Sequence, residues 1–141
     1  MLYLDTSALL PYYRQEQASE RVQTMLDRQN QSVLISHLTE VEFASALARW
    51  VRMDELSDPQ ANKLDSAFHD DISHQRFILC PLTVDHYRRA AHWIATRQTS
   101  LRSLDALHLA CAEYHQAILI SEDDTLIQAA SHFGIEARKA G

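Results

Sequence analysis

The sequence predicts an α/β fold: a three-layer α/β/α sandwich around a central, mainly parallel sheet. Four short apolar runs have the length of strands, at 2–4, 32–36, 76–80 and 117–121. None of them alternates polar with apolar residues, which is typical of strands covered by helices on both faces. Helical stretches separate the runs, as in folds that alternate strands with helices.

Local signals indicate where several helices begin and end. Ser, Thr and Asp are common N-caps, Pro is favoured at the first helical position, and Gly often follows the last turn. The predicted boundaries are Asp58 as N-cap and Pro59 as first residue of a helix reaching about His74, Thr83 as the next N-cap, and Ser121 as the cap of a helix from about Glu122 to Gly134.

The length and composition predict a single domain spanning residues 1–141. The chain is 46% hydrophobic and 23% charged, which is ordinary for a globular protein with a real core. No apolar stretch approaches the length of a membrane span, and no basic segment precedes a long apolar run at the N-terminus. Cys80 and Cys111 have no close partner in sequence, so we expect free structural thiols in a reducing cytoplasm.

Charge and glycine content exclude two classes of function. A formal charge of −6 argues against simple nonspecific nucleic-acid binding, although a cluster of metal-binding acids would lower the charge by itself. Only Gly134 and Gly141 are present, whereas the Walker loop and the dinucleotide fingerprint each need several glycines.

A carboxylate follows the first predicted strand. In "MLYLDTSALL" the apolar run ends at Asp5, and ligand sites in parallel sheets lie beyond the carboxyl ends of the strands. Thr6 and Ser7 are expected to cap the following helix. Capping would explain these two hydroxyls but would leave the aspartate without a structural purpose.

The segment "SHLTEVEFASALARWVR" contains two acids, of which geometry favours one. Glu40 and Glu42 point about 200° apart on a helix, so they cannot serve the same site. Glu42 shares a polar stripe with Ser45, Arg49 and Arg52, whereas Glu40 falls on an apolar side. The alternative is structural: a capping box between Thr39 and Glu42, with solvated arginines.

The segment "LRSLDALHLACAEY" predicts a buried helix, because its apolar residues fall on every side. Asp105 lies in its first turn, where a buried carboxylate needs a cation or several donors. The alternatives are an acid stabilised by the helix dipole or an ion pair with Arg102. His108, one turn on, is better explained as a core histidine or a support for the site than as a metal ligand.

The last acidic segment is "LISEDDTLIQAA". Asp123 shares a helical stripe with Leu126, Ile127 and Ala130 and is expected to face inward, whereas Asp124 is the capping-box acid or a surface charge. The predicted positions of the four acids, Asp5, Glu42, Asp105 and Asp123, lie toward one edge of a parallel sheet. Such a cluster repels unless cations bridge it, and hard oxygen ligands favour Mg²⁺ or Mn²⁺.

These segments, taken in order, resemble PIN-domain ribonucleases, specifically the toxin subunits of VapBC-type (type II) toxin–antitoxin pairs. The likeness covers nearly the whole chain. "YLDTSALL" resembles the family's opening strand, "SHLTEVEF" its Thr-x-x-Glu segment, "LRSLDALHLACA" its third acidic stretch and "LISEDDTLIQAA" the segment with its fourth acid. The family pattern and the helix faces select the same members of both ambiguous pairs.

The resemblance implies a PIN-like fold and a Mg²⁺- or Mn²⁺-dependent endoribonuclease that hydrolyses RNA phosphodiester bonds. An antitoxin would inhibit it, and it would often be a homodimer. The implied residue roles are metal ligands (Asp5, Glu42, Asp105, Asp123), supporting hydroxyls (Thr6, Ser7, Ser121) and RNA-backbone contacts (Arg49, Arg52, Arg102).

Other classes fit less well. A haloacid-dehalogenase-like phosphatase needs a second acid two residues after the first, where this chain has Ser7. A receiver domain needs an acidic pair near its first strand and a lysine late in the sheet. A catalytically inactive PIN-like module that binds RNA or protein remains the main alternative, although it would leave a buried Asp105 unexplained.

Overall fold

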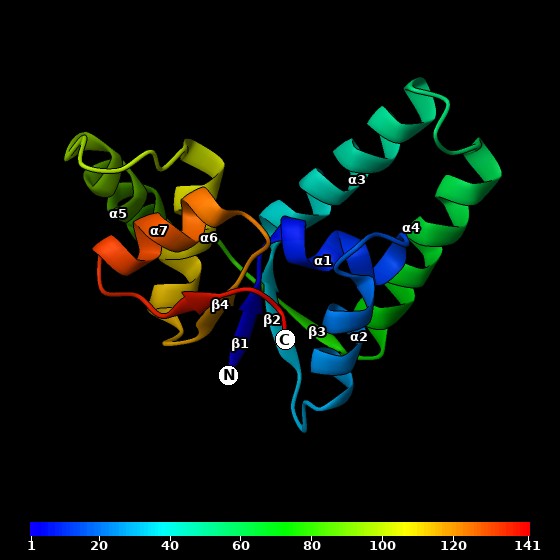
Figure 1. Cartoon of the computed structure of the whole chain (residues 1–141), viewed down its shortest axis with the longest axis horizontal. Coiled ribbons are helices and arrows are strands. Elements are labelled where there is room, and N and C mark those ends of the chain that lie inside the picture. Colours follow the sequence, from blue (N-terminus) through cyan, green and yellow to red (C-terminus); the bar gives the residue numbers. More distant parts are fainter.

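The computed structural model describes residues 1–141, and its five strands form one parallel sheet (Figure 1). The strand order is β3-β2-β1-β4-β5, so β1 lies at the centre and β3 and β5 are the edges. The strands are β1 (Leu2–Leu4), β2 (Val33–Ser36), β3 (Phe77–Cys80), β4 (Ile118–Ile120) and β5 (Ala137–Arg138).

Seven helices cover the two faces of the sheet. One face packs against α1 (Thr6–Tyr13), α2 (Ser19–Asp27), α3 (His37–Arg52) and α4 (Asp58–Ser73). The other packs against α5 (Val84–Ala95), α6 (Ser103–Tyr114) and α7 (Asp124–His132). In Figure 1 the two helical layers diverge as two arms, with α3 and α4 in one and α5 to α7 in the other.

Successive residues of each central strand enter different cores. Leu2 and Leu4 contribute to the core under α1 to α4, whereas Tyr3 between them packs under α5 to α7. In β2, Ile35 and Leu34 divide in the same way. Both faces are therefore apolar, which explains why these strands lack polar alternation. The predicted three-layer α/β class is confirmed.

Three of the five predicted helix boundaries are correct, including the end of α4, whose C-cap is His74, whereas the predicted N-caps Asp58 and Ser121 are wrong. Thr83 is the N-cap of α5, and α7 ends just before Gly134, whose φ of +74° suits a residue without a side chain. The N-cap of α4 is Ser57 rather than Asp58, because the Ser57 hydroxyl accepts the amide of Gln60.

For two elements, α2 and β5, the sequence contains no signal strong enough to predict them. The helix α2 is short, and β5 has only two residues, which pair with β4 at the sheet edge. None of the helices combines the length and the hydropathy needed to cross a bilayer.

Phe43 in α3 gives a direct test of the first core. It is 1% exposed and stacks on Phe68 of α4, with 4.3 Å between ring centroids. We expect Phe43→Ala to lower the free energy of unfolding by about 3–5 kcal/mol, measured by urea denaturation. Val41→Ala on the same helix, at a 67% exposed position, should change it by less than about 0.5 kcal/mol. Similar losses for the two variants would contradict this packing.

Candidate active site

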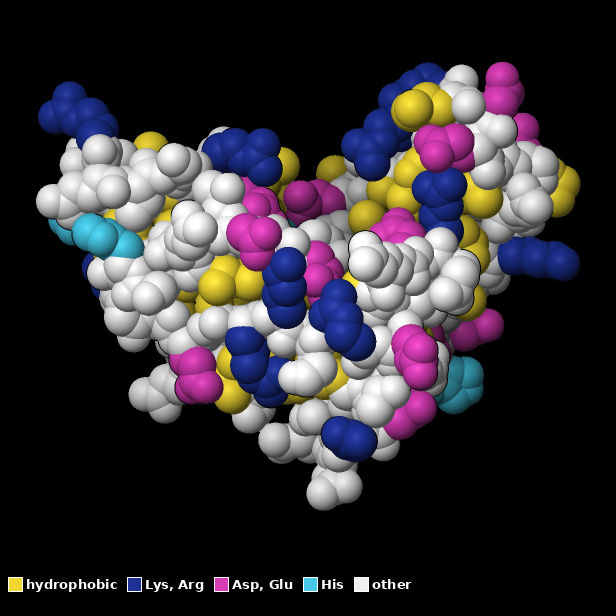
Figure 2. Space-filling view, in the orientation of Figure 1, with side chains coloured by type: hydrophobic (Ala, Val, Ile, Leu, Met, Phe, Trp, Pro, Cys, Tyr) yellow, Lys and Arg dark blue, Asp and Glu magenta, His cyan; other side chains and the backbone are white.

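The four predicted acids line one pocket at the carboxyl edge of the sheet. Asp5 directly follows β1, Glu42 lies in the second turn of α3, Asp105 in the first turn of α6, and Asp123 is the N-cap of α7. All four border a cavity of about 420 Å³. Figure 2 shows acidic side chains at the base of the hollow between the two arms, with basic side chains beside it.

Asp5 is 3% exposed and is itself the N-cap of α1. Its Oδ1 accepts the Ala8 amide at 3.0 Å and the Ser7 hydroxyl at 2.7 Å, and its Oδ2 accepts the Ser121 hydroxyl at 2.7 Å. The prediction that Thr6 and Ser7 cap this helix is therefore wrong. An aspartate accepts the orphan amide as well as a hydroxyl does, so the residue at the strand end takes the cap.

Ser7 and Ser121 hold Asp5 in place and connect it to the next loop. The Ser7 hydroxyl accepts the Glu122 amide at 3.0 Å, and the Ser121 hydroxyl accepts the Asp123 amide at 3.0 Å. The prediction that Ser121 caps the last helix is therefore wrong. Asp123 caps α7 by accepting the amides of Thr125 and Leu126.

Glu42 is anchored from two sides. Its Oε1 accepts the Thr6 hydroxyl at 2.7 Å and lies 2.5 Å from His108 Nε2. A carboxylate only accepts, so Nε2 carries the proton, and in the neutral ring the Tyr3 hydroxyl, 2.6 Å away, donates to Nδ1. His108 is 1% exposed. It is thus a support for the site, one of the two roles the sequence favoured for it.

The Thr39–Glu42 capping box, which was the structural alternative for Glu42, is absent. The helix α3 starts three residues earlier than that box requires, with Ser36 as its N-cap and Thr39 Oγ1 accepting the Ser36 amide at 3.4 Å. Glu42 is therefore free to face the pocket, whereas Glu40 pairs with His37 at the surface.

Asp105 and Asp123 share one arginine. Arg102 Nη2 lies 3.5 Å from Asp105 Oδ2 and 3.6 Å from Asp123 Oδ2, and its side chain is 76% exposed. The structural alternative for Asp105, a pair with Arg102, is thus present as well. Asp105 is only partly buried at the pocket rim, although the rest of α6 from Ala106 to Ala112 is buried as predicted. Asp123 reaches the pocket as a cap, not from the predicted helix stripe.

The electrostatics of the pocket leave negative charge without a matching cation. Burial raises the pKa of Asp5 above its ordinary value, and burial together with Asp123 raises the pKa of Asp105. Burial also acts on Glu42, but the hydrogen bonds from His108 and Thr6 outweigh it and lower the pKa of that carboxyl. Arg102 is paired with only two of the four carboxylates, and together the four form a donor set of hard oxygens that suits a divalent cation such as Mg²⁺ or Mn²⁺.

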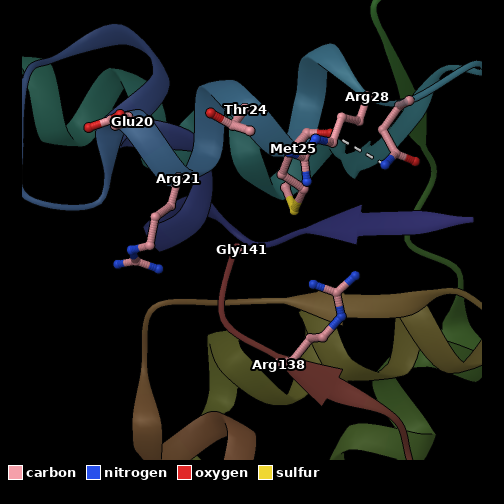
Figure 3. Close-up of a pocket in the computed structure, with 8 residues that line it drawn as sticks. Glu20, Arg21, Thr24, Met25, Arg28, Arg138 and Gly141 are labelled. Atoms are coloured by element: carbon pink, nitrogen blue, oxygen red, sulfur yellow. Dashed lines mark hydrogen bonds between the residues drawn. The ribbon is translucent and has the colours of Figure 1, made fainter.

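The predicted arginines are distributed unevenly. Arg49 and Arg102 line the pocket, whereas Arg52 does not. Nothing in the sequence predicted a second cavity, of about 360 Å³, lined by Arg21 of α2, Arg28 directly after α2, and Arg138 of β5. Figure 3 shows Arg21 and Arg138 extending into the space between α2 and β5. Arg21 also pairs with Glu122, the residue next to Asp123.

The fold and the pocket together define an α/β protein with an acidic site at the carboxyl edge of a parallel sheet. The family model described as PIN domain matches residues 2–131. The chain therefore belongs to the PIN-domain family, as the motifs predicted. No curated protein matches the sequence.

Several solved structures share this fold. FitAcB from Neisseria gonorrhoeae is 19% identical, with a TM-score of 0.71 over 99% of this chain and 98% of that chain. VapC20 from Mycobacterium tuberculosis, described as a sarcin-ricin loop cleaving toxin, is 13% identical, with a TM-score of 0.70 over 96% of each chain. VapBC2 from Rickettsia felis, bound to a promoter DNA fragment, is 13% identical, with a TM-score of 0.68 over 99% and 98%.

Proposed function

We propose that this chain is a Mg²⁺- or Mn²⁺-dependent endoribonuclease that acts in the cytoplasm as the toxin of a toxin–antitoxin pair. The observation that carries the proposal is the convergence of Asp5, Glu42, Asp105 and Asp123 on one pocket of a PIN domain. Structural neighbours that are toxins or toxin–antitoxin complexes support the biological role.

The four carboxylates would hold the ion directly or through water. A divalent cation bound there supplies activation of water and neutralisation of charge on the scissile phosphate. Arg49 and Arg102 border the same cavity and would donate hydrogen bonds to phosphate oxygens. Thr6 and His108 fix Glu42, while Ser7 and Ser121 fix Asp5, so that the acids are oriented before RNA arrives.

The second cavity, lined by Arg21, Arg28 and Arg138 (the arginine cavity), offers a binding surface for the RNA backbone beyond the cleavage point. Arg28 and Arg138 are exposed and line this cavity, and Arg21 connects it to the loop of Asp123 through Glu122. Guanidinium groups bind phosphates without reading base identity.

Replacing Arg28 and Arg138 together by Gln should weaken RNA binding. Each lost phosphate contact also lowers the salt dependence, so the slope of log K against log salt should fall by about 0.7 per contact for single strands. Fluorescence anisotropy with the Asp5→Asn chain as the inactive background measures both quantities. Arg88→Gln, at an exposed position on α5, is the control. Unchanged affinity and slope in the double variant would remove this cavity from the RNA path.

The partners follow from the same comparison. FitAB and VapBC2 are both described as bound to DNA, and another neighbour is a toxin–antitoxin complex from Klebsiella pneumoniae. By analogy we expect a small antitoxin to bind this chain and inhibit it, and we expect a homodimer. Co-purification with the product of the neighbouring gene tests whether an antitoxin binds. Light scattering then measures the oligomeric state.

Cleavage of structured RNA in the presence and absence of a chelator tests the enzymatic proposal. We expect activity with Mg²⁺ or Mn²⁺, none with excess chelator, and a loss of about 100-fold or more in Asp105→Asn. Circular dichroism must show that the variant is folded. Undiminished cleavage by folded Asp105→Asn would refute the metal-site assignment. RNA binding without cleavage across many substrates would favour the inactive binding module instead.

A further inference from the structure

A second group of possible ligands lies outside the acidic pocket. Cys80 is the last residue of β3, Cys111 lies in α6, and His115 is the residue after α6. Both sulfurs and one ring nitrogen of His115 lie within 4.8 Å of one another. Both cysteines are free, 3% and 0% exposed, and belong to the core under α5 to α7.

The fold brings these three residues together from distant segments. Cys111 and His115 are four residues apart, so their side chains share one face of the helical turn. Cys80 comes from the edge strand, where its backbone is paired with Ser36 of β2. His115 is only partly buried, which leaves the group accessible from solvent on one side.

We propose that Cys80, Cys111 and His115 bind a thiophilic transition-metal ion, Zn²⁺ in a reducing compartment, and that the ion ties β3 to α6. Two thiolates and one imidazole are ligands that zinc prefers. Zinc lies about 2.3 Å from sulfur and about 2.0–2.1 Å from nitrogen. Ligand atoms within 4.8 Å of one another can therefore reach one ion with small side-chain rotations.

The site has three protein ligands and an open fourth position. Burial and the nearby His115 lower the pKa of His86, whose Nδ1 accepts the Thr83 amide at 3.0 Å. Its proton is therefore on Nε2, which cannot coordinate a metal while protonated. Water would complete a tetrahedron, so the ion should exchange more readily than in a closed structural site.

The two metal sites would select different ions. The acidic pocket offers only hard oxygens, whereas this group offers two sulfurs and a nitrogen. The helix α6 belongs to both, since it carries Asp105 and His108 as well as Cys111. An ion at the second site would join β3 to α6. It should therefore stabilise the folded chain against unfolding even if the chain does not cleave RNA.

Titration with Co²⁺ distinguishes the two sites by spectroscopy. The chain, stripped of metal and kept reduced with a phosphine, should develop a sulfur-to-cobalt charge-transfer band and intense tetrahedral d–d bands that correspond to one Co²⁺ ion per chain at this site. Added Zn²⁺ should bleach both bands. Oxygen ligation in the acidic pocket gives no such charge-transfer band, so Asp5→Asn should leave the signal unchanged.

Variants of the ligands complete the test. Cys111→Ser should abolish the charge-transfer band, and His115→Ala should weaken Co²⁺ binding by at least ~10-fold without unfolding the chain, because residue 115 lies after the helix. His132→Ala, at an exposed position, is the control. Zn²⁺ should raise the melting temperature of the wild type by more than that of His115→Ala. Absence of the sulfur band, its full retention in His115→Ala, or formation of a Cys80–Cys111 disulfide under reducing conditions would overturn the proposal.

Discussion

Asp5→Asn should reduce RNA cleavage by about 100-fold or more while the chain remains folded. The asparagine oxygen can still accept the amide of Ala8 and the hydroxyl of Ser7, and its amide can donate to the Ser121 hydroxyl. The α1 cap is therefore preserved, and only the negative charge is lost. Cleavage of a labelled RNA under single-turnover conditions measures the effect. Asp124→Asn, which alters an exposed acid paired with Lys139, should cleave at the wild-type rate.

The same substitution should stabilise the metal-free chain. Burial raises the pKa of Asp5 in the folded state above its unfolded value. The contribution of this group to stability is therefore full below the unfolded pKa and is lost as the pH rises through the folded pKa. Asparagine has no such loss. In chelator, the melting temperature of Asp5→Asn should exceed that of the wild type near neutral pH, and the difference should shrink in acid.

Divalent cations should reverse this order of stability. An ion that binds only the folded wild type adds about 2.7 kcal/mol at a concentration of 100 times its Kd. The Asn variant should gain much less from Mn²⁺. A wild type that is no less stable than Asp5→Asn in chelator, or a variant that gains equally from Mn²⁺, would show that Asp5 is a structural cap without a role in binding the ion.

The class of fold could be predicted because both faces of the sheet are apolar. The side chains of Leu2 to Leu4 and of Val33 to Ile35 pack into two different cores. The lack of alternation between polar and apolar residues therefore indicated strands covered on both faces. The helix α2 and the strand β5 depend on tertiary contacts rather than on local pattern. The strand β5, for example, exists through its pairing with β4.

The sequence located the acids of the pocket more reliably than it assigned their local roles. Asp5, Thr6 and Ser7 are all good caps, as are Ser121 and Asp123, and local rules cannot rank such neighbours. In both cases the aspartate caps the helix and the serine supports it. The arginine cavity could not be predicted from the sequence for a different reason: Arg28 and Arg138 lie far apart in the chain, and only the fold brings them together.

His108→Ala should weaken both the site and the fold. The imidazole is buried and contacts Glu42 on one side and Tyr3 on the other. Removal leaves a cavity and two polar groups without their partner, so we expect a loss of about 2–4 kcal/mol in the free energy of unfolding. Tyr3→Phe removes only the outer hydrogen bond, keeps the ring in place and should cost about 1 kcal/mol.

The pH dependence of cleavage separates a positioning role for His108 from a purely structural one. The hydrogen bond from His108 helps to lower the pKa of Glu42 against the effect of burial. Without it the Glu42 carboxyl stays protonated to a higher pH, so the acid limb of the cleavage profile should move to higher pH in His108→Ala. His108→Gln, whose amide can still donate to Glu42, should restore part of that shift. If the profile of folded His108→Ala coincides with that of the wild type, His108 supports only the core, and the orientation of Glu42 depends on Thr6 alone.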